Sequence, residues 1–242
     1  MEDDPMGLGD IYLCGFNEVP RYSLAFSIRI GREIDGVGFL RGLGKLKDAV
    51  ASYQKAIGLK PDYAEAHHNL GNALKDLGKQ EEAVTSYRKA LDLKSDYADA
   101  HNNLGSVLQE LGKPEEAIAS YRKALAIKPD LAEAHNNLGI ALRELGHLDE
   151  AVTSYRKALG LKPDYADAHN NLGAALRDLG KLEEAVGSFR KTLGLKPKHA
   201  LAHNNLGTAF RGLGKLEDAV TSYQKALILK PDYADAHNNL GA

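Results

Sequence analysis

The chain has 242 residues, of which 31 are basic and 33 acidic, and its formal net charge at pH 7 is −2. Its 43% hydrophobic content is typical of a folded soluble protein, and the near-neutral charge excludes the broad basic surface that non-specific nucleic-acid binding requires. Cys14 is the only cysteine, which excludes an intrachain disulfide bond.

The first part of the chain is irregular. Residues 1–26 begin without the basic stretch of a secretory signal and match nothing further along, so we expect a disordered or unrelated leader. The apolar run over 22–30 is far shorter than the ~20 residues of a membrane helix. A soluble, cytoplasmic protein without a membrane partner is therefore expected.

Two helices are predicted before residue 61. The helix expected over 30–43 contains four glycines, and each destabilises a helix interior by about 1 kcal/mol, so we expect it to fray. The helix over 45–60 is better formed, with Gly44 as the preceding turn and an apolar face of Ala49, Tyr53 and Ala56.

Residues 64–97 contain two further helices joined by a tight turn. In the first half, apolar residues recur at the spacing of a helix face, and Asp62 is predicted as its N-cap, with Glu65 three residues later. Gly78 is expected to end this helix in the left-handed conformation. The second half, from Lys79, repeats the helical pattern.

The same pattern recurs every 34 residues along the chain. The pentapeptide His-Asn-Asn-Leu-Gly, or His-His-Asn-Leu-Gly in its first copy, begins at His67, His101, His135, His169, His203 and His237. A fixed period of this length predicts a solenoid, in which each unit buries its apolar face against its neighbours. Residues 64–233 hold five complete units, 27–63 a degenerate unit, and 234–242 the first helix of another.

The units resemble the tetratricopeptide repeat family. That family has a bulky residue, then Leu-Gly, a large apolar residue, alanine, an aromatic residue, alanine and proline at fixed offsets. The second complete unit matches with His101, Leu104, Gly105, Leu108, Ala117, Tyr121, Ala124 and Pro129. The departures are histidine for the usual aromatic, Ser95 for proline and Thr192 for alanine. The resemblance implies an all-α fold, a right-handed superhelical solenoid of antiparallel helix pairs.

Two columns of polar residues follow the repeat on the first helix of each unit. By the resemblance, these helices line a concave groove, and asparagines at the matching position of O-GlcNAc transferases hold the backbone of client segments. The candidate peptide-binding residues are Asn69, Asn103, Asn137, Asn171, Asn205 and Asn239. A secondary groove column comprises His68, Asn102, Asn136, Asn170 and Asn204. The alternative is that the asparagines were copied by duplication and bond to the neighbouring unit.

Other chemistry is not indicated. One histidine per unit places neighbours too far apart to share a metal ion, and a packing position explains them better. The recurring acidic pairs, such as Glu81/Glu82, suit first-turn helix positions rather than a catalytic dyad. Acidic residues near the second column disfavour a clamp for a client's C-terminal carboxylate. No catalytic motif, metal site or cofactor is expected.

The sequence therefore predicts a protein-interaction scaffold that binds an extended peptide segment of a client in its concave groove. The alternative is a substrate-selecting N-terminal fragment of a larger transferase similar to O-GlcNAc transferases. Self-association through the uncapped C-terminal end is a further expectation.

Overall fold

The computed structural model of the chain describes residues 45–241, and this part holds twelve α-helices and no strands. Helices of 14 and 13 residues alternate, followed by a final one of 8 residues. The outer helices are α2 (Leu46–Leu59), α4 (Gln80–Leu93), α6 (Pro114–Ile127), α8 (Leu148–Leu161), α10 (Leu182–Leu195) and α12 (Leu216–Leu229). The inner helices are α3 (Ala64–Asp76), α5 (Ala98–Glu110), α7 (Ala132–Glu144), α9 (Ala166–Asp178), α11 (Ala200–Gly212) and α13 (Ala234–Gly241).

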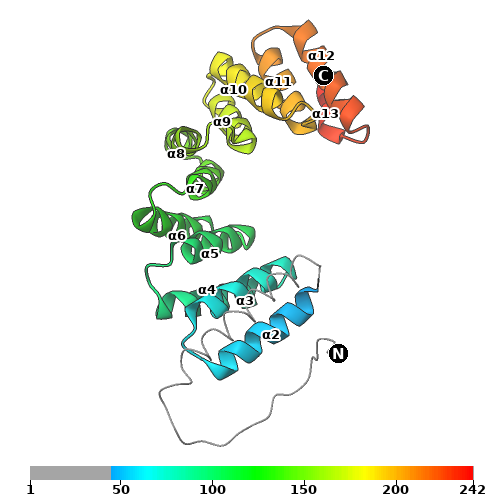
Figure 1. Cartoon of the computed structure of the whole chain (residues 1–242). Coiled ribbons are helices and arrows are strands. Elements are labelled where there is room, and N and C mark those ends of the chain that lie inside the picture. Colours follow the sequence, from blue (N-terminus) through cyan, green and yellow to red (C-terminus); the bar gives the residue numbers. More distant parts are fainter. Residues whose placement is uncertain (1–44, 242) are drawn as a thin grey trace, which may run out of the picture.

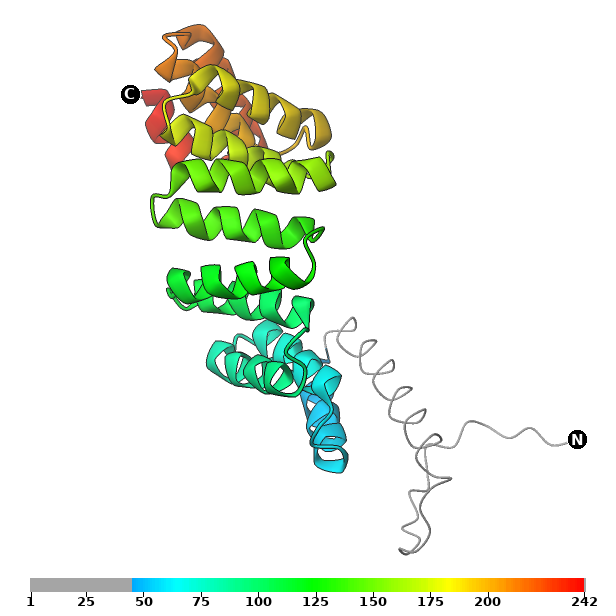
Figure 2. The same cartoon turned by 90° about the vertical axis from the view of Figure 1, so that its left-hand side faces the viewer.

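The helices stack in chain order into one curved array (Figure 1). Each inner helix packs on the outer helices before and after it, and it also contacts the inner helices of the adjoining units. The inner helices of successive units approach one another more closely than the outer helices do, so they line the concave side. Figure 2 shows the array from its side, with successive pairs lying one above the other. The predicted all-α solenoid of antiparallel helix pairs is confirmed.

A glycine in the left-handed conformation joins the two helices of each unit. Gly78 has φ +74°, and its repeat counterparts from Gly112 to Gly214 have φ between +71° and +79°. The N–H of Gly78 donates to Lys75, and that of Lys79 donates to Leu74, which satisfies carbonyls at the end of α3. The left-handed turn predicted at Gly78 is confirmed.

The N-cap predicted at Asp62 is wrong. Helix α3 begins at Ala64 with Tyr63 in the cap position, and no side chain caps it. Asp62 is exposed in the turn before the cap, one residue too early for its carboxylate to serve the first helical N–H groups. The Glu65 carboxylate instead accepts a bond from Lys94 at 3.3 Å.

The core of each unit depends on a contact between a glycine and an aromatic ring. A Cβ atom added to Gly71 would lie 2.6 Å from Cε1 of Tyr87, and the same contact recurs in the other four units. The aromatic side chains of this position are 0–1% exposed in every complete unit. Glycine is therefore required for the inner helix to lie flat on the ring.

Some sequence predictions fall on residues that the structure does not describe. The leader over 1–26, the helix expected over 30–43 and Cys14 lie outside the described residues. Helix α2 corresponds to the helix predicted over 45–60, with Ala49, Tyr53 and Ala56 buried as expected. Among the residues from 45 to 241, no helix has the length and apolar character needed to cross a membrane.

Candidate functional site

A histidine fixes each inner helix to the loop before it. Its Nε2–H donates to the carbonyl of the residue six positions earlier, at 2.8–3.1 Å in all six units. Burial lowers the pKa of His101, His135 and His203 below the usual value of 6.5, although the bond to the carbonyl opposes this shift. The prediction that these histidines occupy a packing position agrees with this arrangement.

The acidic pairs at the starts of the outer helices join neighbouring units. Arg88 on α4 pairs with Glu116 on α6 at 3.1 Å, and the same ion pair recurs one and two units later. All of these side chains are more than half exposed, so each pair contributes only ~0–1 kcal/mol. Within residues 45–241 no three potential metal ligands gather at one point.

The first column of predicted site residues lies along the inner helices of the array. Asn69, Asn103, Asn137, Asn171 and Asn239 are half-buried, whereas Asn205 is only 8% exposed. Most of these amides are therefore accessible along the concave side, at one position per unit.

The second column lies deeper than the first. Asn102, Asn136, Asn170 and Asn204 are 4–8% exposed. Each of their Oδ1 atoms accepts an N–H from the first-column asparagine of the next unit, at 3.1–3.3 Å. The bonds that the sequence analysis named as the alternative to recognition are therefore present: the asparagines join neighbouring units.

In the central units the two columns form a continuous chain of amides. The Nδ2 of Asn136 donates to Asn137 within helix α7 at 3.4 Å, and Asn137 donates to Asn102 of the preceding unit at 3.3 Å. A primary amide has two N–H donors and two acceptor lone pairs. Asn137 thus keeps one donor and one lone pair for a ligand, while its neighbours fix the orientation of the amide.

The row of hydrogen-bonded amides ends at the first complete unit, where a histidine replaces the second-column asparagine. His68 occupies the second column, and its Nε2 accepts from Asn103 at 3.1 Å. The ring proton must then lie on Nδ1, where it donates to the Tyr97 hydroxyl at 3.0 Å. Burial raises the pKa of Tyr97 to about 12, with Glu65 and Asp99 adding to the shift. Asn103 also donates to Asn72, so both of its N–H groups are used here.

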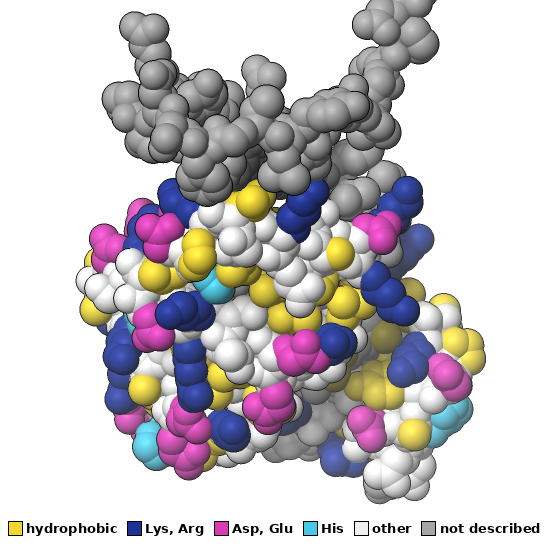
Figure 3. All heavy atoms as spheres, turned by 90° about the horizontal axis from the view of Figure 1, so that it is seen from below, with side chains coloured by type: hydrophobic (Ala, Val, Ile, Leu, Met, Phe, Trp, Pro, Cys, Tyr) yellow, Lys and Arg dark blue, Asp and Glu magenta, His cyan; other side chains and the backbone are white. Residues whose placement is uncertain are grey.

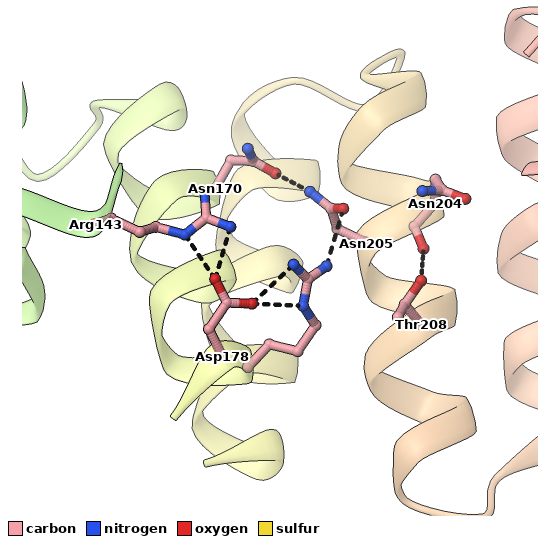
Figure 4. Close-up of polar contacts among 7 residues, drawn as sticks. Arg143, Asn170, Asp178, Asn204, Asn205 and Thr208 are labelled. Carbon is pink, nitrogen blue, oxygen red and sulfur yellow. Dashed lines mark hydrogen bonds and ion pairs between the residues drawn. The ribbon is translucent and has the colours of Figure 1, made fainter. Parts of the chain in front are cut away.

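The concave side is hollowed between α11 and α13. Asn204, Asn205, Asn238 and Asn239 line this hollow, together with Arg177 and Leu201. It brings together residues of both predicted columns at one place. Figure 4 shows Asn205 between Asn170 and the arginine network, and the Thr208 hydroxyl donating to the backbone carbonyl of Asn204.

A second row of polar contacts between units, which was not predicted from the sequence, lies at the C-terminal ends of the inner helices. A long polar side chain of one unit reaches an acidic residue of the next, as in Gln109 to Glu144 at 2.8 Å and Arg143 to Asp178 at 2.7 Å. Lys75 reaches Glu110 in the same way at 3.3 Å. The signal was present as two further columns of period 34, next to each other at the end of each inner helix.

Charges of both signs are mixed over the surface. In the face seen in Figure 3, basic and acidic side chains alternate with hydrophobic ones and no large area has a single sign. This distribution agrees with the net charge of −2. Any charge preference of the concave side must therefore come from individual positions rather than from the whole molecule.

Comparisons with known proteins identify the repeat. Family models for the tetratricopeptide repeat match residues 40–78, 71–112 and 207–242, then 96–164, and then 136–200. A search of curated proteins finds no match.

Several solved structures are similar to this chain. YrrB, described as a tetratricopeptide repeat protein with an unusual peptide-binding site, is 27% identical with a TM-score of 0.67, over 78% of this chain and 98% of YrrB. MamA is 28% identical with a TM-score of 0.63, over 68% of this chain and 96% of MamA. PilF from Pseudomonas aeruginosa has a TM-score of 0.77 at 19% identity, over 86% of this chain and 95% of PilF, and shows the fold alone.

Proposed function

Because this chain belongs to the tetratricopeptide repeat family, we propose that it is a protein-interaction scaffold whose concave side binds an extended segment of a client protein. The observation that carries this proposal is the amide chain of the inner helices. It presents the half-buried Asn103, Asn137 and Asn171, each hydrogen-bonded to the second-column residue of the preceding unit.

An oriented primary amide suits the backbone of an extended peptide. The free N–H of Asn137 is a donor for a peptide carbonyl, and the remaining lone pair of its Oδ1 accepts a peptide N–H. Each such bond contributes about 0.5–1.5 kcal/mol, so several units together support binding without contacts to client side chains. Because the amides are already fixed, little side-chain entropy is lost when the client binds. The peptide-binding site that the description of YrrB names is a parallel for this use of the fold.

We also propose that the described repeats do not catalyse a reaction. The repeat histidines donate to loop carbonyls, and acidic residues of the outer helices pair with arginines of neighbouring units. Both kinds of side chain are explained by their structural contacts, and a binding role requires nothing further from them.

Two double variants separate recognition from the bonds between units. Asn137→Ala with Asn171→Ala removes two groove amides and the two bonds that they donate to the preceding units. Asn102→Ala with Asn136→Ala removes the acceptors of those same two bonds, together with the N–H groups that Asn102 and Asn136 donate to Asn103 and Asn137, but leaves the groove amides in place. Both variants should lose about 0.5–1.5 kcal/mol of stability per bond, measured by urea unfolding.

Peptide binding should distinguish the two variants. Wild-type chain is first screened on an array of extended synthetic peptides, and the best binders are titrated by fluorescence anisotropy. We expect the Asn137/Asn171 variant to lose at least about tenfold in affinity, the value for roughly two hydrogen bonds, and the Asn102/Asn136 variant to keep most of it. Equal losses in both variants would mean that the asparagines serve only the contacts between units.

The alternative function, a substrate-selecting front end of a larger transferase, uses the groove in the same way. The two proposals differ in what the native polypeptide contains besides this chain. Blotting source cells with an antibody to the repeats distinguishes them: a band near 26.2 kDa favours a separate scaffold, and a much larger band favours part of a larger protein.

A further inference from the structure

Helix α11 differs in charge from the other inner helices. Each of α3, α5, α7 and α9 has an acidic residue at its second position and another at its last, whereas α11 has Leu201 and Gly212 there. Arg211 is therefore the only formally charged residue of α11, and the helix has a net charge of +1. Because the units are otherwise near copies, these two changes, one at each end of the helix, distinguish α11 from the other inner helices.

The contact between α7 and α9, one unit earlier, shows what the missing acid would do. Both oxygens of the Asp178 carboxylate are used: Oδ2 accepts from Arg143 of the unit before, at 2.7–2.8 Å, and Oδ1 accepts from Arg177 of its own helix, at 3.0 Å. Figure 4 shows the Asp178 carboxylate between the two arginines. One carboxylate thus joins an arginine from each of two successive units.

The corresponding contact between α9 and α11 has the two arginines but not the carboxylate. Gly212 stands 34 residues after Asp178, and Arg177 and Arg211 stand 34 residues after Arg143 and Arg177. Arg177 has no acid on α11 to reach, and its NH1 bonds to the side-chain oxygen of Asn205 at 3.4 Å. Arg211 is exposed, and its guanidinium makes no hydrogen bond or ion pair with any residue from 45 to 241.

We propose that the position left open at Gly212 receives a side-chain carboxylate, from an aspartate or glutamate of the client segment, held by Arg177 and Arg211. This inference rests on the proposed binding of an extended segment in the groove. The carboxylate takes the place that Asp178 occupies one unit earlier. Arg177 offers it the NH1 group that now bonds to Asn205, while its Nε and NH2 groups remain on Asp178, and Arg211 offers its exposed guanidinium.

The surroundings direct an acidic client residue to this end of the groove. The other inner helices have an acidic residue at the second position, namely Glu65, Asp99, Glu133, Asp167 and Asp235. Lys94 pairs with Glu65 and Lys196 with Asp167, so repulsion of an acidic client comes mainly from the other three. At α11 the corresponding residue is the uncharged Leu201, which is 44% exposed and lines the same hollow as Arg177; Asp235 of α13 also lines this hollow. A single acidic residue of the client would thereby fix its register along the repeats.

The test supplies the missing carboxylate from the chain itself. In Gly212→Asp, an internal acid competes with the client for the two arginines, whereas Gly212→Asn adds a side chain of the same size without charge. A Cβ at Gly212 meets Cδ1 of Leu182 at 2.8 Å, a movable side-chain end, and this contact is the same in both variants. Circular dichroism establishes that both variants fold.

The probes are array-selected peptides with acetylated N-termini and amidated C-termini, each synthesised with glutamate and with glutamine at the acidic position. We expect the wild-type chain to prefer glutamate by about fivefold, the upper range for a partly exposed charge pair. The preference should disappear in Gly212→Asp and be largely kept in Gly212→Asn.

The other outcomes overturn the inference in distinguishable ways. An equal preference in wild type and Gly212→Asp would place the carboxylate elsewhere. Binding without a preference for glutamate over glutamine would refute the side-chain carboxylate and leave groove binding intact. If no peptide binds at all, the proposed function fails, and this inference fails with it.

Discussion

At the scale of single residues, the closest packing of each unit is set by the glycine that meets the buried ring. The fourth unit offers a clean test because two of its helical glycines, Gly173 and Gly187, have different surroundings. A Cβ at Gly173 would lie 2.6 Å from Cε1 of Phe189, whereas a Cβ at Gly187 on α10 meets no atom within 4 Å. The same substitution at these two positions should therefore have opposite effects.

We predict that Gly173→Ala lowers the free energy of unfolding by about 1–3 kcal/mol, because the ring cannot move away from the added methyl group in a packed core. Gly187→Ala should raise it by about 0.5–1 kcal/mol, because alanine loses less conformational freedom in a helix. Urea unfolding followed by circular dichroism measures both. A stable Gly173→Ala protein would mean that the inner helix can shift away from the ring at little cost.

At the scale of elements, the buried histidines join each loop to the helix that follows. Burial holds the pKa of His101, His135 and His203 below 6.5 in the folded chain, while the unfolded chain keeps about the usual value. Between the two values the unfolded chain binds more protons, so stability rises with pH there. This contribution is complete above about pH 6.5 and is lost as the pH falls through the folded-state pKa values.

We predict that the urea midpoint falls as the pH is lowered from about 7 to about 5, the range in which histidine becomes charged. The triple variant His101→Phe, His135→Phe and His203→Phe keeps the ring volume and should show a smaller fall. An unchanged fall in the triple variant would assign the pH effect to other groups.

Most of the helices and turns could be predicted from the sequence because they depend on short-range patterns. The helix periodicity and the glycine at Gly78 are local signals, and the structure contains both the helices and the left-handed turn. The N-cap predicted at Asp62 is wrong because the turn after Pro61 places the first helical residue two positions beyond Asp62. Side-chain preference alone does not show where this turn ends.

The contacts between units could not be predicted in the same way. The columns of asparagines were visible from the period, but the bond between Asn137 and Asn102 spans 35 residues and depends on how one unit is rotated against the next. The same holds for Arg143 and Asp178: only their approach across the junction shows that Gly212 leaves a place open. Sequence periodicity identifies the columns, and the structure identifies which columns meet.

At the scale of the whole molecule, each unit is stabilised by its contacts with the units on either side. Hydrogen bonds between asparagine side chains, together with ion pairs, join each unit to its neighbours. A residue in the middle of the array is therefore supported from both sides. The buried aliphatic residue early in each outer helix shows the difference: Val152 on α8 is 4% exposed, and its counterpart Val220 on α12 is 41% exposed. In such arrays, opening an end disrupts one interface, whereas opening the centre disrupts two.

We therefore predict that, among helices α2 to α13, amide hydrogen exchange is fastest in α13 and slowest near α7 and α8. Helix α13 has only Ala236 buried, while α7 buries residues along most of its length, including Leu138 and Leu142. Local opening of α13 exposes little apolar surface, so its amides should exchange at least about tenfold faster than those of α7. Mass spectrometry of exchanged peptides measures this gradient. Equal protection along the array would mean that the units unfold together, because the bonds between them outweigh the stability differences within them.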